Sequence, residues 1–139
     1  MGDPDRPIFI DTGAWYALVD MDDAHHKDAL SIYPELLNTY RVLVTSNLVV
    51  AEAYVLILNE IGHPTAVGFL ERIHTSPRIT KVYSTEDIEK DAEDTLRKYT
   101  DQDFSYADSV SFTIMKRQKI RKAFSFDKHF QTIGFITLP

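Results

Sequence analysis

The stretch PIFIDTGAWYALV, residues 7–19, decides the fold expected for this chain. Its first four residues, PIFI, are a short apolar run typical of a buried strand. The run ends at Asp11, and GAWYALV then begins a pattern typical of a helix. The same order, a strand followed by a helix, recurs along the rest of the chain.

Further strands and helices alternate beyond this stretch. Strands are expected at RVLVTS (41–46), ITKVYS (79–84), AFSF (123–126) and FITL (135–138). Helices are expected at about 22–40, from Asn47 onward, from about Pro64 onward, at about 86–98 and at 106–119. Strands that alternate with helices favour an α/β fold with a mostly parallel sheet of five strands.

Four residues set the expected helix boundaries. Pro34 should break or kink the helix at 22–40, because proline lacks the backbone N–H and clashes with the preceding turn. Asn47 is expected as the N-cap of the next helix. Gly62 is expected to stop that helix, and Pro64 to sit in the first turn of the one that follows.

Length and composition indicate an ordinary globular protein. The 139 residues fit one domain, residues 1–139, and 44% of them are hydrophobic and 26% charged. The chain has no cysteine, which excludes disulfides and thiolate zinc sites and is compatible with a reducing cytosol. No apolar segment of a signal peptide precedes PIFID, and the longest apolar run is too short to span a bilayer. We therefore expect a cytoplasmic protein with no membrane association.

Glu52 is the exception in LVVAEAYVLIL, residues 48–58, where every other residue is apolar or aromatic. A carboxylate is costly to bury because its charged form loses hydration. Glutamate is almost never fully buried without a partner. We therefore expect the Glu52 side chain to face a pocket or a counter-charge.

Three more carboxylates fall where such a pocket is expected. Asp11 ends the first strand, Asp127 follows AFSF, and Asp108 begins the helix before AFSF. Sites in open α/β sheets form at the carboxyl ends of strands. If the first, second and fourth strands are neighbours, these three side chains and Glu52 converge at one edge of the sheet.

Each carboxylate also has a simpler interpretation. Asp11 and Asp127 fit helix N-caps, Ser105 and Asp108 fit a capping box, and Glu52 fits a partly exposed helix face. Capping does not explain Glu52, which lies too far along its helix. Four clustered carboxylates repel one another, and a divalent cation is the usual remedy. Oxygen ligands favour Mg²⁺ or Mn²⁺, and such sites perform phosphoryl chemistry.

With these residues identified, the chain resembles a PIN-domain ribonuclease, in particular the VapC-type toxin of prokaryotic toxin–antitoxin pairs. The resemblance covers essentially the whole chain and rests on the order and spacing of all its motifs. These are IFIDTGAWYALV with Asp11 and Thr12, the helix with Glu52, DFSYADSVSF with Asp108, and FSFDKHF with Ser125 and Asp127. One position departs from the family pattern: Gly13 stands where a small hydroxyl or amide residue often follows the Asp-Thr pair.

The resemblance implies a three-layer α/β/α fold and metal-dependent hydrolysis of RNA. The acidic roles, both catalytic and metal-binding, carry over to Asp11, Glu52, Asp108 and Asp127. Thr12 and Ser125 would orient a water or a carboxylate, and Asp103 would add a nearby charge or simply be a solvated loop acid. The implied partners are an RNA substrate, a cognate antitoxin protein and a second copy of the chain, which would pack through the helices after Asn47 and Pro64.

The expected mechanism is in-line attack by water that Mg²⁺ or Mn²⁺ activates. Asp11, Asp108 and Asp127 would hold one ion, while Glu52 would help to hold a second or position the nucleophile. Attack by water rather than by the ribose 2′-hydroxyl leaves 5′-phosphate and 3′-hydroxyl ends.

The basic run KRQKIRK, residues 116–122, is a second candidate for RNA contact. Lys116, Arg117 and Lys119 would neutralise backbone phosphates. The alternative is a solvated helix end, where cations favour the helix dipole. The pair His25 and His26 is a poor metal site, because adjacent side chains on a helix point about 100° apart.

Other functions remain possible from the sequence. A haloacid-dehalogenase-like phosphatase needs a second aspartate where Gly13 stands, and a receiver domain needs an aspartate at the end of ITKVYS. A non-catalytic PIN-like module that binds RNA or a protein is the stronger rival, since the sequence does not exclude it.

Overall fold

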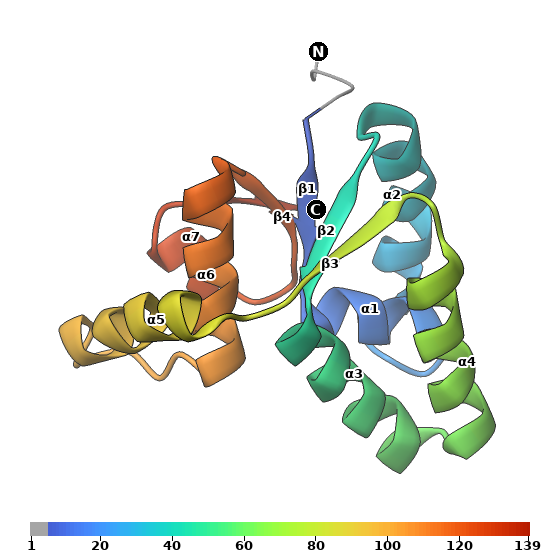
Figure 1. The fold of residues 1–139 in the computed structure, drawn as a ribbon. Coiled ribbons are helices and arrows are strands. Elements are labelled where there is room, and N and C mark those ends of the chain that lie inside the picture. Colours follow the sequence, from blue (N-terminus) through green and yellow to red (C-terminus); the bar gives the residue numbers. More distant parts are fainter. Residues whose placement is uncertain (1–5) are drawn as a thin grey trace.

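Five parallel strands form the centre of the molecule (Figure 1). The computed structural model describes residues 6–139, so the start of the segment examined for a signal peptide, residues 1–5, lies outside the described residues. Within 6–139 the strand order is β3-β2-β1-β4-β5, and every pairing is parallel. The strands are β1 (Ile8–Ile10), β2 (Leu43–Ser46), β3 (Ile79–Val82), β4 (Lys122–Phe124) and β5 (Ile136–Leu138). The predicted α/β fold is confirmed.

The central strand β1 is buried because the sheet carries helices on both faces. Ile8, Phe9 and Ile10 are all fully buried, as expected of a parallel strand covered on both sides. Phe9 pairs with Val44 of β2 on one side and with Ala123 of β4 on the other. β1, β2 and β4 are therefore neighbours, which was the condition for the predicted carboxylates to converge.

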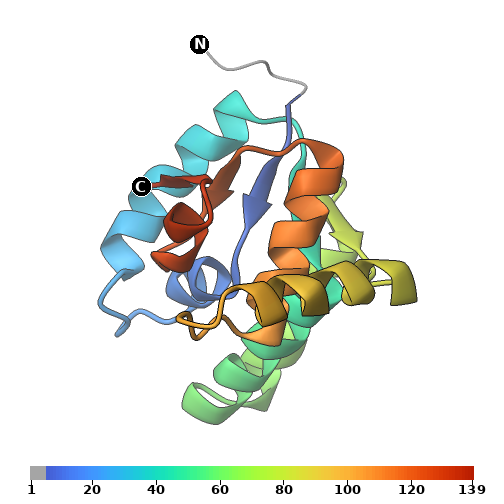
Figure 2. The same cartoon turned by 90° about the vertical axis from the view of Figure 1, so that its left-hand side faces the viewer.

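Helices cover both faces of the sheet (Figures 1 and 2). α5, α6 and α7 lie on one side in Figure 1, and α1, α2 and α4 on the other. In residues 6–139 the helices are α1 (Thr12–Val19), α2 (His26–Thr39), α3 (Asn47–Glu60), α4 (His63–Thr75), α5 (Glu86–Lys98), α6 (Tyr106–Gln118) and α7 (His129–Thr132). None of the helices in this range is long and apolar enough to cross a membrane.

One expectation about α2, the residue at which it begins, was wrong. The helix begins at His26 rather than near residue 22, because the Asp20 carboxylate accepts the backbone N–H of Asp22 and holds a turn there. Pro34 lies inside the helix and does not break it. The buried side chains Ala29 and Leu36, on either side of Pro34, keep both halves against the core at the cost of one hydrogen bond.

The start of α3 also differs from the prediction. Ser46 is the N-cap, since its Oγ accepts the backbone N–H of Val49 at 3.1 Å. Asn47 is the first residue of the helix, and its Oδ1 instead accepts the backbone N–H of Ser84 at 2.8 Å. This bond ties the start of α3 to the segment after β3.

The predicted boundaries around α4 and α6 are confirmed. Gly62 follows the end of α3 with a φ of 134°, a conformation that glycine adopts without strain. Pro64 lies in the first turn of α4. Ser105 and Asp108 form the predicted capping box of α6. α6 runs from this cap back along the sheet to the start of β4, in the direction opposite to the strands. Its first turn therefore lies at the carboxyl end of the sheet (Figure 1).

Candidate active site

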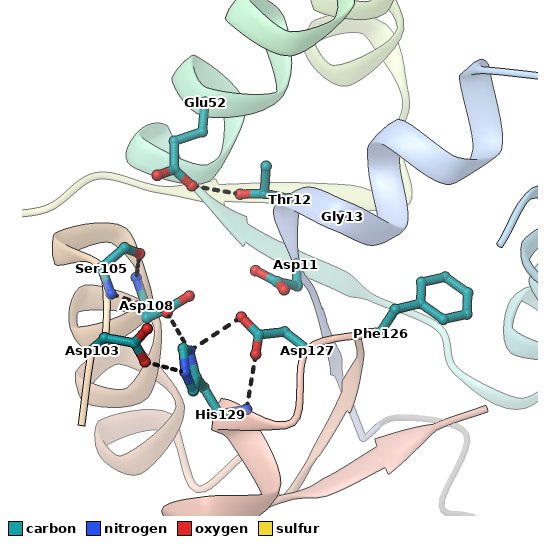
Figure 3. A pocket seen from close by; sticks show the side chains of 10 residues that line it. All are labelled: Asp11, Thr12, Gly13, Glu52, Asp103, Ser105, Asp108, Phe126, Asp127 and His129. Carbon is teal, nitrogen blue, oxygen red and sulfur yellow. Dashed lines mark hydrogen bonds and ion pairs between the residues drawn. The ribbon is translucent and has the colours of Figure 1, made fainter. Parts of the chain in front are cut away.

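All four predicted carboxylates line one cavity of about 440 Å³ at the carboxyl end of the sheet (Figure 3). They come from the end of β1, the second turn of α3, the first turn of α6 and the loop after β4. The lining residues are Asp11, Thr12, Gly13, Glu52, Asp103, Ser105, Asp108, Phe126, Asp127 and His129. The topology thus brings together residues from opposite ends of the sequence.

Asp11 is the most buried of the four, with 5% of its surface exposed. It occupies the N-cap position of α1, but its side chain makes no capping hydrogen bond. Its Oδ2 instead accepts the hydroxyl of Ser125 at 3.0 Å. The simple N-cap interpretation of this carboxylate is therefore wrong, since its hydrogen bond goes to a residue of the cavity wall.

Ser125 joins two of the acidic positions. Its Oγ donates to Asp11 and also accepts the backbone N–H of Asp127, again at 3.0 Å. The hydroxyl is buried and so has one orientation that satisfies both bonds. Ser125 therefore fixes the Asp11 carboxylate relative to the loop that carries Asp127.

Glu52 lies on the exposed side of α3, where it overlooks the cavity. The buried side of α3 is formed by other residues, among them Val49 and Ala53. Glu52 Oε1 accepts the hydroxyl of Thr12 at 2.9 Å. Both interpretations of Glu52 thus hold together: it is on a partly exposed helix face, and that face borders the cavity.

Asp108 is the third residue of α6 and is 8% exposed. Its Oδ2 accepts the backbone N–H of Ser105 at 3.1 Å, as the capping box requires. The same oxygen lies 3.1 Å from Nδ1 of His129. Asp108 therefore caps its helix and also faces the cavity.

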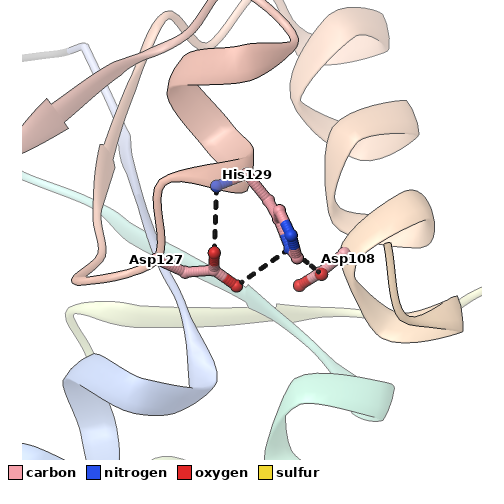
Figure 4. Close-up of side chains that lie close together, drawn as sticks. All are labelled: Asp108, Asp127 and His129. Carbon is pink, nitrogen blue, oxygen red and sulfur yellow. Dashed lines mark hydrogen bonds and ion pairs between the residues drawn. The ribbon is translucent and has the colours of Figure 1, made fainter. Parts of the chain in front are cut away.

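His129 is a cavity residue that the sequence analysis did not single out (Figure 4). Its Nδ1 lies 3.1 Å from Asp108 and 3.3 Å from Asp127 Oδ2, and its Nε2 lies 2.9 Å from Asp103 Oδ1. The ring packs edge-on against Phe104. The available signal was its place two residues after Asp127 in FSFDKHF.

The two remaining acids take different positions. Asp127 Oδ1 accepts the backbone N–H of His129 at 2.9 Å, so it caps the first turn of α7 while its other oxygen faces the histidine. The Asp103 side chain is 95% exposed and reaches the cavity only at its rim, through His129. Asp103 is thus both a loop acid and a neighbour of the cluster.

The electrostatics of the cavity oppose the ionised carboxylates. Burial and the Asp108 carboxylate raise the pKa of Asp11 to about 7. Burial also raises the pKa of Asp108 and of Glu52. Burial alone lowers the pKa of His129, but the hydrogen bond to Asp108 and the charge of Asp127 outweigh it, so the net shift is upward. The site gathers more negative charge than its single imidazole balances.

The residues present fit a divalent cation. Asp108, Asp127 and His129 each offer one ligand atom, and these atoms all lie within 4.8 Å of one another. Carboxylate oxygens suit Mg²⁺ and Mn²⁺, and a cation would remove the repulsion that raises the pKa of Asp11. Asp11 borders this group of ligand atoms across the same cavity.

The other candidate residues lie elsewhere. Lys116, Arg117 and Lys119 are at the far end of α6, which places Lys116 about 12 Å along the helix axis from Asp108. His25 stacks on Phe126, whereas Nδ1 of His26 is 2.7 Å from the carbonyl oxygen of Ala17. The two histidines therefore contact different partners.

Comparison with known proteins places the chain among PIN domains. Residues 8–136 match the sequence profile described as the PIN domain. A Mycobacterium tuberculosis protein named 23S rRNA-specific endonuclease VapC20 is 33% identical over 130 residues, which cover 93% of this chain and 95% of that protein. An Archaeoglobus fulgidus VapC ribonuclease is 26% identical over 130 residues, covering 90% of this chain and 81% of the relative.

Solved structures of related proteins have the same fold as this chain. The crystal structure of M. tuberculosis VapC20, described as a sarcin-ricin loop cleaving toxin, superimposes with a TM-score of 0.86 at 32% identity, covering 93% of this chain and 96% of that one. VapBC2 from Rickettsia felis, bound to a DNA fragment from its promoter, matches with a TM-score of 0.70 at 10% identity, over 95% and 97% of the two chains. The second likeness shows the shared fold alone.

Proposed function

The chain belongs to the PIN domain family, and we propose that it is a divalent-metal-dependent endoribonuclease that hydrolyses RNA phosphodiester bonds. The observation that carries this proposal is the convergence of Asp11, Glu52, Asp108 and Asp127 on one cavity. Relatives named as ribonucleases support the choice of RNA as substrate. The unit would be a single domain over residues 1–139.

The ligands of the cation would come from both sides of the cavity. Asp108 and Asp127 would hold it together with His129, and Asp11 and Glu52 would complete the site for one or two ions. When bound, Mg²⁺ or Mn²⁺ neutralises charge at the phosphate and makes water more acidic. Attack by water would leave 5′-phosphate and 3′-hydroxyl ends.

Hydroxyl groups and one exposed acid would keep these side chains in place. Thr12 donates to Glu52 and so orients the carboxylate over the cavity. Ser125 donates to Asp11 and holds the Asp127 loop. Asp103 faces Nε2 of His129 and so keeps Nδ1 turned toward the other acids. Partners of this kind orient metal ligands and raise their affinity for the ion.

The exposed apolar face of α3, beside the cavity, is the proposed surface for a second copy of the chain. Val55, Leu56 and Ile61 are 51%, 40% and 41% exposed, which is high for large apolar side chains. We propose that α3 and α4 pair with a second copy. A monomeric mass by light scattering at micromolar concentration would count against this pairing.

A cognate antitoxin is the other proposed partner. The support is the likeness to VapC proteins and to the VapBC2 structure. An open reading frame next to the gene, whose product copurifies with this chain and inhibits its cleavage of RNA, would support the proposal. We also propose a cytoplasmic location, where RNA would be accessible to the enzyme.

The test of the activity is cleavage of a mixed-sequence RNA pool with Mg²⁺ or Mn²⁺ by the native chain and by Asp108→Asn. We expect metal-dependent cleavage by the native chain, none by the variant, and products with 5′-phosphate ends. Equal cleavage by both proteins would place the activity outside this cavity. Products with 2′,3′-cyclic phosphate would contradict attack by water, and binding of RNA without cleavage would favour the non-catalytic module.

A further inference from the structure

A pair of stacked aromatic rings lies at the rim of the cavity, and none of the roles above uses it. Phe126 stands between Ser125 and Asp127 and packs its ring face to face on His25. The centroids are 4.3 Å apart and the ring planes differ by 10°. His25 is exposed and comes from the segment before α2, so two parts of the chain far apart in sequence build this flat surface.

The pair is anchored on both sides. The Phe126 ring meets the buried Phe124 edge-on, with centroids 5.8 Å apart. The backbone N–H of His25 donates to Asp23 Oδ2 at 3.0 Å, which fixes the turn that carries the imidazole. The two rings are thus ordered before any ligand arrives, which lowers the entropic cost of stacking a further ring on them.

The stacked pair is continuous with the acidic cavity. Phe126 lines the same cavity as Asp11 and Asp127, and Figure 3 shows its ring on one flank of the carboxylates, pointing away from them. Gly13 also lines the cavity, is exposed, and has open space around the position of a Cβ. A flexible ligand chain can therefore reach both the carboxylates and the rings.

Each nucleotide of single-stranded RNA carries a charged phosphate next to a flat base. Acidic residues with a cation take the first, and aromatic or histidine side chains take the second. We propose that Phe126, backed by His25, is a stacking platform for a nucleobase adjacent to the scissile phosphate. The proposal rests on the proposed function and names the part of the substrate that the cavity rim binds.

The experiment uses short single-stranded RNAs in which 2-aminopurine replaces one base, moved through each position in turn. Binding is measured with Asp108→Asn protein in magnesium buffer, so that the RNA stays intact. Stacking quenches 2-aminopurine fluorescence. We expect strong quenching at one or two adjacent positions. Phe126→Leu should abolish it and Phe126→Trp should retain it, because leucine keeps apolar bulk but lacks a ring face.

Tyr83→Leu is the matched control. Tyr83 is another exposed aromatic residue, 62% exposed, but it does not line the cavity. Its removal should leave the quenching unchanged. Quenching that persists in Phe126→Leu, or that disappears in Tyr83→Leu instead, overturns the platform.

A second readout separates stacking from a merely structural role of Phe126. In the same Asp108→Asn background, adding Phe126→Leu should weaken RNA affinity about tenfold, within the range for loss of one stacked base. An abasic nucleotide at the quenched position should remove this difference between the two proteins. A tenfold loss on both the intact and the abasic RNA would show that Phe126 only supports the fold, and would overturn the proposal.

The outcomes for the platform and for the nuclease are distinct. Cleavage by the native chain with no effect of Phe126→Leu on quenching rejects the platform and leaves the proposed function standing. Quenching that depends on Phe126, in a chain that never cleaves RNA, supports the platform and rejects the nuclease.

Discussion

The charged side chains at the two ends of α6 differ in how they are paired. At the C-terminal end, Arg117 lies 2.7 Å from Asp87 and 2.6 Å from Asp91, so the guanidinium is matched by two carboxylates of α5. At the N-terminal end, Asp108 shares a cavity with Asp11 and Asp127, and the nearest opposing group is the imidazole of His129. The charge of Arg117 is neutralised by the protein itself, while the acids at the other end keep an excess of negative charge.

This contrast separates a structural charge cluster from a proposed binding site. The pairs around Arg117 are exposed and hold α5 against α6. The acids around Asp108 include one whose pKa is raised to about 7 by burial and by its neighbours. Buried carboxylates that lie close together with too little positive charge nearby favour binding of a cation from solution.

The largest expected effect is on cleavage. Asp108→Asn should lower the rate of RNA cleavage by at least about 100-fold, because even residues that only orient metal ligands change activity 10–100-fold. Arg117→Gln, at the opposite end of the same helix, should leave the rate unchanged. Single-turnover cleavage of a defined RNA measures both. Equal losses in the two variants would erase the distinction between the ends of α6.

The second effect is on stability without metal. The folded-state pKa of Asp11 is about 7, above its unfolded value near 3.8, so the folded state retains a proton that the unfolded state loses. Stability should therefore fall as pH rises from about 4 to about 7 and then level off. Asp11→Asn should stabilise the metal-free protein at pH 8 by on the order of 4 kcal/mol, the pKa difference of about three units converted at about 1.36 kcal/mol per unit. Urea unfolding in chelator at pH 4 and pH 8 checks this, and destabilisation at pH 8 would contradict it.

A smaller effect is expected where a hydroxyl, rather than a counter-charge, orients a carboxylate. Thr12→Val removes the hydrogen bond to Glu52 while keeping the shape of the side chain, and should lower cleavage about tenfold. Thr12→Ser keeps the hydroxyl and should cleave nearly as well as the native chain. If both variants cleave equally, Thr12 does not act through its hydroxyl.

The smallest effect concerns the basic end of α6. Lys116 and Lys119 are exposed, whereas Arg117 is engaged by α5. If the lysines hold the RNA backbone as predicted, each substitution by glutamine should reduce the slope of log affinity against log salt by about 0.7. Arg117→Gln should change the slope less than either lysine variant. An unchanged slope in all three would leave this end of α6 outside the RNA interface.

The fold could be predicted from the sequence because its signals are local. The apolar run before Asp11 and the boundaries of α5 follow from pattern alone, and both are confirmed. The errors lie where tertiary contacts prevailed over local preference. α2 continues through Pro34 because side chains before and after it are buried. Ser46 rather than Asn47 caps α3, because the side-chain oxygen of Asn47 accepts the backbone N–H of Ser84.

The convergence of the acids on one cavity could be predicted from the sequence, but the side chains that contact them could not. Asp11, Asp108 and Asp127 follow from the rule that sites form at the carboxyl ends of parallel strands. His129 was missed because its importance depends on α7, a short helix that aims the ring at Asp108. The stacking of His25 on Phe126 joins segments about 100 residues apart, and no local pattern reports such a contact.

The most direct test of the account is calorimetric titration of Mn²⁺ into the metal-free protein at neutral pH. The native chain and Arg117→Gln should bind the ion with the same affinity, and Asp108→Asn should bind it at least about tenfold more weakly. Equal affinity in Asp108→Asn and the native chain, or no binding by the native chain, would contradict the claim that this cavity is a cation site.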